Sequence, residues 1–461
     1  MAEGVEPSRV AFVSFTTAAV NEARARAQSR FGLVARDLPY FRTLHSLAFS
    51  SLGLGRNAVL GDYATFAREV GMRLRGARGI EAVFAPLGAD DVLLHAHQLC
   101  AATQLPFAEV VRRYRLKANP ERYAAFLARL IDWKTQNKKI EYSDMLGDFL
   151  RHRLETPVEV AFVDEAQDLT PQQWSVVHQA FAGAREMWVA GDDDQAIYHW
   201  AGADVMHMLS LPGDHIVLDR SHRLPNVIKA LADGISARIR HRKPKVWSGT
   251  GRPGSVDLAA SLATLKLEEG SWMMLARSTY GLRPFTDWLE SAGVPYRING
   301  VAALADAEVA SYRAMIALRA GEAVDGAEVK RMLARGAWAG ERLRFRASDL
   351  VTRDKLDERA LLDEEALLSD IEPKRRRFMR HVEANGTWDR NVEVSTIHQA
   401  KGAEADHVML NPVLSGATEA ALRSEGYADD EHRVWYVGAS RARRSFRLLR
   451  VPGTPAYPLR S

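Results

Sequence analysis

The chain has 461 residues, 47% of them hydrophobic and 26% charged, as in ordinary globular proteins, and this length requires two or more domains. Lysine plus arginine (62) exceed aspartate plus glutamate (58) only slightly, which excludes a general polycation and confines any nucleic-acid surface to a local groove. The single cysteine, Cys100, excludes an intrachain disulfide and a cysteine-based zinc site. No signal-peptide pattern and no apolar run of roughly 18 residues is present, so we expect a cytoplasmic protein without a membrane partner.

Short apolar runs in the first half predict the buried strands of a parallel sheet. Residues 10–15 form the first run and are followed by a predicted helix over 18–30. Residues 158–163 and 187–190 form the next two runs. Strands of this kind, separated by helical stretches, indicate an α/β sheet. Residues 50–148 have a helical, polar pattern, so we expect an insertion between residues 1–49 and 149–214 of the first domain.

The second half repeats this plan. Strands are predicted at residues 215–218, 271–276, 392–396, 408–410 and 446–449. The stretch between them, residues 302–390, is helical and charged and predicts a second insertion. The fold class is therefore α/β, with two parallel-sheet domains that each carry a mainly helical insertion. The second domain is expected to comprise residues 215–301 and 391–461.

Two carboxylates follow the strand predicted at residues 158–163. Asp164 at a strand end can hold Mg²⁺ through its waters, and Glu165 beside it can accept a proton from an attacking water. Acidic residues also cap helix N-termini for electrostatic reasons alone. Taken alone, the pair therefore leaves both interpretations open.

The next strand ends in a polar turn that contains aromatic residues. Residues 191–203 read Gly-Asp-Asp-Asp-Gln-Ala-Ile-Tyr-His-Trp-Ala-Gly-Ala. Gln195 can sense a terminal phosphate, and Tyr198 and Trp200 can stack on nucleic-acid bases, which any base sequence permits. Packing of both aromatics in the core is the alternative. Functional groups beyond the carboxyl ends of parallel strands are typical of ligand sites.

Read in order, these segments resemble the superfamily-one DNA helicases of the UvrD, Rep and PcrA type. The resemblance rests on ordered motifs that extend from residue 14 to residue 443. They are Ser14-Phe15-Thr16, Thr43-Leu44-His45-Ser46, Tyr142-Ser143-Asp144, Asp164-Glu165-Ala166-Gln167-Asp168, residues 191–203, Ser221-His222-Arg223, residues 396–404 and residues 431–443. The triplet at 221–223 departs from the family's usual Asn-Tyr-Arg, because His222 replaces the tyrosine that stacks on adenine.

The resemblance implies two RecA-like domains of the P-loop NTPase type and a role for each matched residue. Asp164 would hold Mg²⁺, Glu165 would activate water, and Gln195, Arg223 and Arg441 would surround the γ-phosphate of ATP as further catalytic residues. Glu404 would contact the ribose and His222 the base. The DNA-binding residues implied are Phe15, Thr16, Thr43, His45, Tyr198, Trp200, Thr396 and His398. The second insertion is shorter than the corresponding insertion in the large bacterial members of the family.

The activity implied is ATP-dependent movement 3′ to 5′ on single-stranded DNA, with unwinding of the duplex at junctions, in DNA repair, replication or recombination at the nucleoid. The family's Walker A loop should lie about 25 residues before Phe15, and no lysine in this chain follows a glycine. We therefore expect an N-terminally incomplete first domain, and doubt turnover by this chain alone. Two alternatives remain open: a subunit that completes its ATP site with a protein partner, and a DNA-binding accessory protein without turnover.

Basic runs at residues 112–117, 238–245 and 374–380 are the remaining signals. Each could contact DNA phosphates, which would make binding sensitive to salt. Each could equally be the solvated face of a helix.

Overall fold

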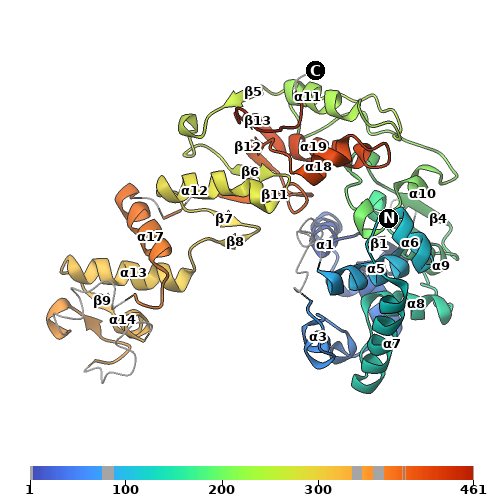
Figure 1. The fold of residues 1–461 in the computed structure, drawn as a ribbon, viewed down its shortest axis with the longest axis horizontal. Helices are drawn as coiled ribbons and strands as arrows, with labels where there is room; N and C mark the ends of the chain where they lie inside the picture. The colour runs from blue at the N-terminus through green and yellow to red at the C-terminus, as the bar shows by residue number, and fades with distance from the viewer. Residues whose placement is uncertain are drawn as a thin grey trace. The chain divides into compact units, whose positions relative to one another are not determined.

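The computed structural model describes residues 4–74, 88–334, 345–356, 368–386, 388–389 and 391–459. The chain forms two compact units. The first comprises Met1–Arg220, Asp233–Trp247 and Ala417–Val437, and the second comprises Ser221–Ala232, Ser248–Gly416 and Gly438–Ser461. The first unit thus includes two stretches from the second half of the sequence. Figure 1 shows the elements of both units along the chain.

The first unit is built on a four-stranded parallel sheet in the order β2-β1-β3-β4. Its strands are β1 (Val10–Val13), β2 (Phe41–Arg42), β3 (Val160–Val163) and β4 (Glu186–Val189). Its helices outside the insertion are α1 (Thr17–Phe31), α2 (Leu44–Ser51), α8 (Tyr142–Arg151), α9 (Pro171–Ala180) and α10 (Val205–Leu209). Because all four strands are parallel, their carboxyl ends share one edge of the sheet.

The two faces of this sheet are covered to different extents. On one face, alternate strand residues such as Ala11, Val13 and Val163 are buried against α2, α8 and α9 in one hydrophobic cluster. On the other face, Val10 and Val160 pack with Val20 of α1. Farther along that second face Phe162 is 39% exposed and Trp188 on the edge strand β4 is 51% exposed. Parallel sheets are usually buried on both faces, so this region is unusually open.

The first insertion is a helical subdomain with its own core. Its described helices are α3 (Ala64–Glu69), α5 (Ala89–Thr103), α6 (Phe107–Arg113) and α7 (Pro120–Asn137). Phe66, Leu94, Phe126 and Leu130 are among the buried residues of a cluster that is separate from the sheet's core. Hydrogen bonds and ion pairs around the buried Glu141, which precedes α8, join the two parts.

The second unit is built on a seven-stranded sheet in the order β5-β13-β12-β6-β11-β7-β8, which is parallel except for the β7–β8 pair. Its strands are β5 (Ser255–Ala260), β6 (Trp272–Ala276), β7 (Arg297–Ile298), β8 (Val301–Ala302), β11 (Val392–Thr396), β12 (Ala405–Asn411) and β13 (Ala442–Leu449). Helix α12 (Arg283–Ser291) follows β6. Helices α11 (Asn226–Ser236), α18 (Gly416–Leu422) and α19 (Ala428–Ala439) each continue from one unit into the other along the chain.

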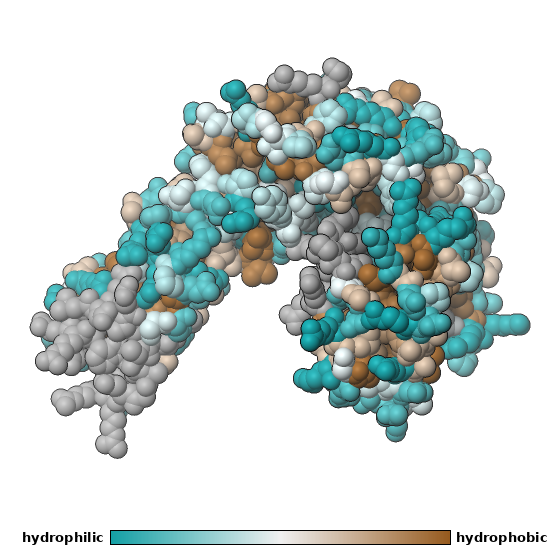
Figure 2. Space-filling model, viewed as in Figure 1, coloured by the Kyte–Doolittle hydropathy of each residue, from teal (hydrophilic) through white to brown (hydrophobic). Residues whose placement is uncertain are grey.

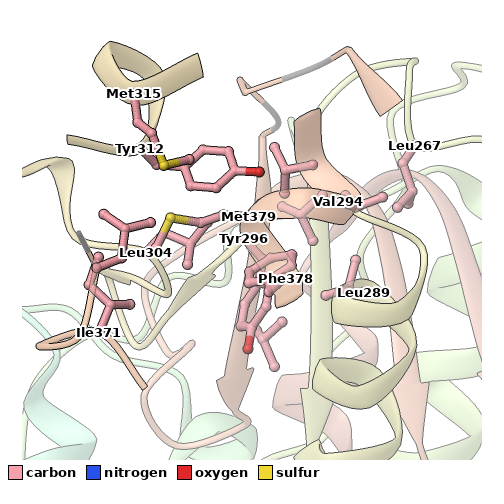
Figure 3. Packing of buried hydrophobic residues seen from close by; sticks show 14 of the residues in the cluster. Leu267, Leu289, Val294, Tyr296, Leu304, Tyr312, Met315, Ile371, Phe378 and Met379 are labelled. Atoms are coloured by element: carbon pink, nitrogen blue, oxygen red, sulfur yellow. The ribbon is translucent and has the colours of Figure 1, made fainter. Parts of the chain in front are cut away.

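The second insertion shares its core with the second sheet. Its described elements are α13 (Asp306–Arg319), β9 (Val324–Asp325), α14 (Gly326–Leu333), β10 (Leu350–Val351) and α17 (Pro373–Asn385). Tyr312 and Met315 of α13 point toward Met379 of α17, and Phe378 lies beside Tyr296 (Figure 3). One cluster contains these residues together with strand residues of the sheet, so this insertion packs directly on the domain that carries it.

The predicted fold class is confirmed, and so are most predicted strands. The strand predicted at residues 215–218 is wrong: the segment is irregular, and Ile216 and Leu218 are 75% and 85% exposed. Hydrophilic residues cover much of the visible face of each unit, with smaller hydrophobic areas between them (Figure 2). Among the described residues, no helix combines the length and the apolar character that a membrane crossing requires.

Candidate functional site

The candidate functional residues of the first unit lie on the loops that follow the four strands of its sheet. Phe15 follows β1, Thr43 follows β2, Asp164 follows β3, and Gly191 follows β4. Parallel pairing places all four loops at the carboxyl edge, which is where open α/β sheets bind ligands. The structure therefore collects the sequence motifs of the first half at one edge.

Asp164 and Glu165 form a half-buried pair of carboxylates at this edge. Burial, followed by repulsion from Glu165, raises the pKa of the Asp164 carboxyl above its usual range. Glu165 has φ +53°, in the left-handed region that costs a non-glycine residue about 1 kcal/mol. Its Oε2 accepts a hydrogen bond of 2.5 Å from Nε2 of the fully buried Gln167. Strained, desolvated carboxylates of this kind are typical of functional sites.

A cation would relieve the repulsion at Asp164, and the donor chemistry there fits Mg²⁺, which prefers oxygen ligands and retains several waters. A second acidic group, formed by Asp192, Asp193 and Asp194, has its carboxylate oxygens within 4.8 Å of one another. Lys245 already supplies a positive charge there, because its Nζ lies 2.5 Å from Asp193 Oδ1 and 3.1 Å from Asp194 Oδ2 and also contacts Asp192. The residues present therefore favour Asp164 as the Mg²⁺ ligand.

Gln195 lies in the loop after β4 and is connected to the carboxylate pair through Gln167. Gln195 Nε2 donates to Asp192 Oδ2 at 2.7 Å, and the Asp192 amide donates to Gln167 Oε1 at 3.0 Å. Gly191 makes this arrangement possible, since a Cβ at that position would lie 2.6 Å from Gln167 Oε1. The predicted phosphate sensor and the predicted base are thus linked by one buried glutamine.

Aromatic side chains form a platform at the same edge. The rings of Phe15 and Tyr198 are stacked with centroids 5.4 Å apart, and Trp200 meets Tyr198 edge-on at 6.3 Å. Phe15 is 38% exposed. The structure therefore brings together three of the residues that the sequence predicts to bind DNA, from loops separated by more than 180 residues.

His45 has an aromatic neighbour that the sequence analysis missed as a DNA-binding candidate. Tyr142, the first residue of α8, packs edge-on against the His45 ring at 5.5 Å and is 52% exposed. Burial lowers the pKa of the His45 imidazole to about 4, so this ring is neutral at physiological pH. The sequence signal that could have identified Tyr142 is an aromatic residue at the first position of a helix.

The hydroxyls of Thr16 and Thr43 cap helices. Thr16 Oγ1 accepts from the Ala19 amide at the start of α1, and Thr43 Oγ1 accepts from the Ser46 amide at the start of α2, both at 3.2 Å. Such caps satisfy amides that lack an intrahelical partner. Any DNA contact by these residues would therefore be made in addition to a structural role.

In the second unit, Arg223 and Glu404 lie near each other, with a distance of 3.9 Å between Arg223 Nη1 and Glu404 Oε2. Arg443 approaches the same carboxylate at 3.2 Å. Arg441 is buried, and its guanidinium donates to Ser440 Oγ at 2.9 Å and to the Ala403 carbonyl at 3.4 Å. His222 is exposed. The structure thus brings Arg223 and Glu404 together and directs Arg441 toward protein atoms.

Two residues predicted to bind DNA in this unit are buried. Thr396 ends β11 and is 3% exposed, with its hydroxyl 3.2 Å from Gln399 Oε1. His398 is 2% exposed. A direct contact with DNA through either side chain would require it to become exposed.

Comparison with known proteins adds an independent line of evidence. Residues 1–215 match the model of the UvrD/REP helicase N-terminal domain, and residues 351–449 match that of the UvrD-like helicase C-terminal domain. The chain is similar to proteins named ATP-dependent DNA helicase PcrA. It is 24% identical to that of Bacillus subtilis (strain 168) over 266 residues, which cover 53% of this chain and 35% of the relative. It is 25% identical over 280 residues to that of Leuconostoc citreum, which cover 54% and 35%. The chain thus spans about a third of the length of these relatives.

Proposed function

Because the chain belongs to the UvrD/Rep/PcrA-like family of helicases, we propose that it is an ATP-dependent DNA translocase and helicase. It would move 3′ to 5′ along single-stranded DNA and unwind the duplex at junctions, in repair, replication or recombination. The observation that carries the proposal is the meeting of a carboxylate pair, Gln195 and an aromatic platform at one edge of the first sheet.

We assign the nucleotide chemistry as follows. Asp164 would hold the Mg²⁺ of the bound nucleotide, and Glu165 would accept the proton of the attacking water. Gln195 and Arg223 would contact the γ-phosphate, where guanidinium groups stabilise the charge of the transferring phosphoryl group. Arg441 would join them only if its buried guanidinium turns away from Ser440 and Ala403. His222 and Glu404 would contact the base and the ribose. The raised pKa of Asp164 and the strain at Glu165 support the roles of these two carboxylates.

DNA binding would depend on stacking rather than on base-edge hydrogen bonds. Phe15, Tyr198 and Trp200 form a stacked and edge-on set, and every base has a face that can stack on such rings. His45, Thr16 and Thr43 complete the proposed contacts. Thr396 and His398 would join them only if their buried side chains become exposed. A platform of this kind suits a protein that must move along any sequence, because stacking tolerates all four bases.

Binding of labelled oligo-dT, measured by fluorescence anisotropy, tests the DNA site. Tyr198→Ala should weaken binding by about 5- to 150-fold, since base stacking contributes about 1–3 kcal/mol, whereas Tyr198→Phe keeps the ring and should bind nearly normally. Phe31→Ala is the matched control, because Phe31 is an exposed aromatic at the opposite end of α1. Unchanged affinity of a folded Tyr198→Ala protein would overturn the DNA site.

A second candidate concerns the source of the loop that cradles the ATP phosphates, which either further sequence of the same protein or a partner polypeptide would supply. The 461 residues contain no Gly-Lys pair, whereas the phosphate-cradling Walker A loop requires one. If a partner polypeptide supplies that loop, this chain is a subunit that completes the ATP site jointly. Hydrolysis would then appear only when both polypeptides are mixed, while oligo-dT binding would belong to this chain alone.

A further inference from the structure

The loop that carries Gln195, Tyr198 and Trp200 is anchored by an unusual charge cluster, formed by Asp192, Asp193, Asp194, Arg242 and Lys245. Asp193 and Asp194 are 3% and 2% exposed. Three adjacent carboxylates in such an environment repel one another strongly and require nearby cations. Arg242 and Lys245 provide them from a segment about 50 residues farther along the chain.

The contacts within the charge cluster are specific. Arg242 forms a fork on Asp194, with Nε 2.7 Å from Oδ1 and Nη2 2.6 Å from Oδ2. Lys245 contacts all three carboxylates, and the Lys243 amide donates to Asp193 Oδ2 at 2.7 Å. Burial opposes ionisation of Asp192, yet the charge of Lys245 holds its pKa below the usual range. Arg242 and Lys245 belong to the basic run at residues 238–245, for which the sequence left open a solvated helix face or a contact with DNA phosphates. Because both side chains are paired with carboxylates, these two residues fit neither interpretation.

Asp192 connects the charge cluster to the residues that act on ligands. One of its oxygens contacts Lys245, and the other accepts from Gln195 Nε2 at 2.7 Å. Three residues beyond Gln195 lies Tyr198, whose ring stacks on Phe15. The position of Asp192 thus bears on both the phosphate sensor and the stacking platform.

Helix α19 holds the same loop at two further points. Arg433, which is 3% exposed, donates from Nε to the Asp193 carbonyl at 2.9 Å. One turn earlier on the helix, Asp430 Oδ2 lies 2.8 Å from Nδ1 of His199. Gln195 and Tyr198 therefore lie between two anchored points of the loop.

We propose that Lys245 and Arg242 are positioning residues: by neutralising Asp192, Asp193 and Asp194 they hold the 191–202 loop in the conformation that binds single-stranded DNA. This inference rests on the proposed function for its DNA readout. It assigns neither residue a contact with DNA. An affinity that depends on an ordered loop falls in proportion to the fraction of molecules in which that loop is ordered.

Hydrogen exchange measures the order of the loop without any ligand. Lys245→Met removes the charge while it keeps most of the side-chain length, and it should accelerate exchange of the amides of residues 191–202. Peptides from β3 should exchange as in the wild type, which shows that the sheet remains folded. Lys245→Arg should restore protection, and Lys117→Met, an exposed lysine of the same unit, is the matched control. Unchanged protection of the loop in Lys245→Met would overturn the proposal.

Oligo-dT binding then separates positioning from direct contact. We expect Lys245→Met to weaken binding by about tenfold, which corresponds to a loop ordered about a tenth of the time. The slope of log affinity against log salt should be unchanged, because loss of a phosphate contact reduces that slope by about one. A reduced slope would overturn positioning in favour of direct contact. If the loop loses protection but the wild type binds no oligo-dT, the positioning stands and the proposed function fails.

Discussion

The buried network around Glu141 provides a quantitative test of how the first insertion is attached. The Glu141 carboxylate is 2% exposed and contacts the Tyr63 hydroxyl, His97 Nε2 and Lys134 Nζ. Lys134 also pairs with Asp144 at 2.6 Å. Lys134→Met removes the cation and leaves a desolvated carboxylate in place.

The expected cost follows from burial. Breaking a buried ion pair by removing one partner costs about 3–5 kcal/mol. Two partners of Glu141 remain in the Lys134→Met protein, so we expect the lower end, about 3 kcal/mol. Glu141→Gln in the same protein removes the stranded charge and should recover about 1–2 kcal/mol, as expected for two residues in direct contact.

Hydrogen exchange of α7 amides reports the local free energy of opening. A loss of about 3 kcal/mol corresponds to exchange that is roughly 150-fold faster, and peptides from β12 in the second unit should not change. Lys117→Met is the exposed control and should shift the opening energy by less than about 0.5 kcal/mol. An effect of Lys134→Met no larger than that of the control would refute the claim that this network joins the insertion to the sheet domain.

Three further predictions concern the same unit. Burial alone would raise the pKa of the Glu141 carboxyl, but hydrogen bonds, chiefly from His97, lower it from 4.5 to about 2. Because a depressed carboxyl pKa stabilises the folded state at higher pH, about 3 kcal/mol of the free energy of unfolding should be lost between pH 5 and pH 2. Glu141→Gln should show a smaller loss in acid titrations followed by circular dichroism. Burial lowers the pKa of His45, so the unfolded chain takes up a proton near pH 6.5 and the folded chain does so only near pH 4. The free energy of unfolding should therefore fall by about 1 kcal/mol from pH 7 to pH 5, after allowance for partial exposure. His45→Gln should remove that part of the fall. Gly191→Ala would place a Cβ 2.6 Å from Gln167 Oε1 and should cost about 1–3 kcal/mol in urea unfolding, whereas Gly183→Ala meets no atom within 4 Å and should be nearly neutral; equal stability of the two variants would contradict the close packing of the loop.

The strands that the sequence predicted correctly are those whose apolar runs are buried. Residues 271–276 contain β6, every residue of which is buried, so a continuous hydrophobic pattern was sufficient. The pattern failed at residues 215–218, where an apolar run remains exposed and irregular. It also missed β5, an edge strand whose residues are mostly exposed or half-buried. Composition alone does not distinguish these cases, because burial is decided by distant parts of the chain.

In the candidate site, too, local motifs could be recognised in the sequence and contacts between distant residues could not. Motif order identified Asp164, Glu165, Gln195 and Tyr198, and strand pairing explains why their loops share an edge. The charge cluster could not be predicted, since Lys245 and Arg242 reach carboxylates about 50 residues away and no local pattern records such a pairing. From the sequence, residues 238–245 indicated only a basic surface.

Binding of Mn²⁺ with ATP, followed by electron paramagnetic resonance, tests the central claim most directly, because Mn²⁺ replaces Mg²⁺ at oxygen ligands. Substitutions in the two acidic groups of the first unit, Asp164–Glu165 and Asp192–Asp194, should have opposite effects. If Asp164 holds the metal of the nucleotide, Asp164→Asn should abolish ATP-dependent Mn²⁺ binding, while Asp193→Asn, at a carboxylate already paired with Lys245, should leave it intact. ATP-dependent Mn²⁺ binding that survives Asp164→Asn would contradict the assignment of this edge as the nucleotide site.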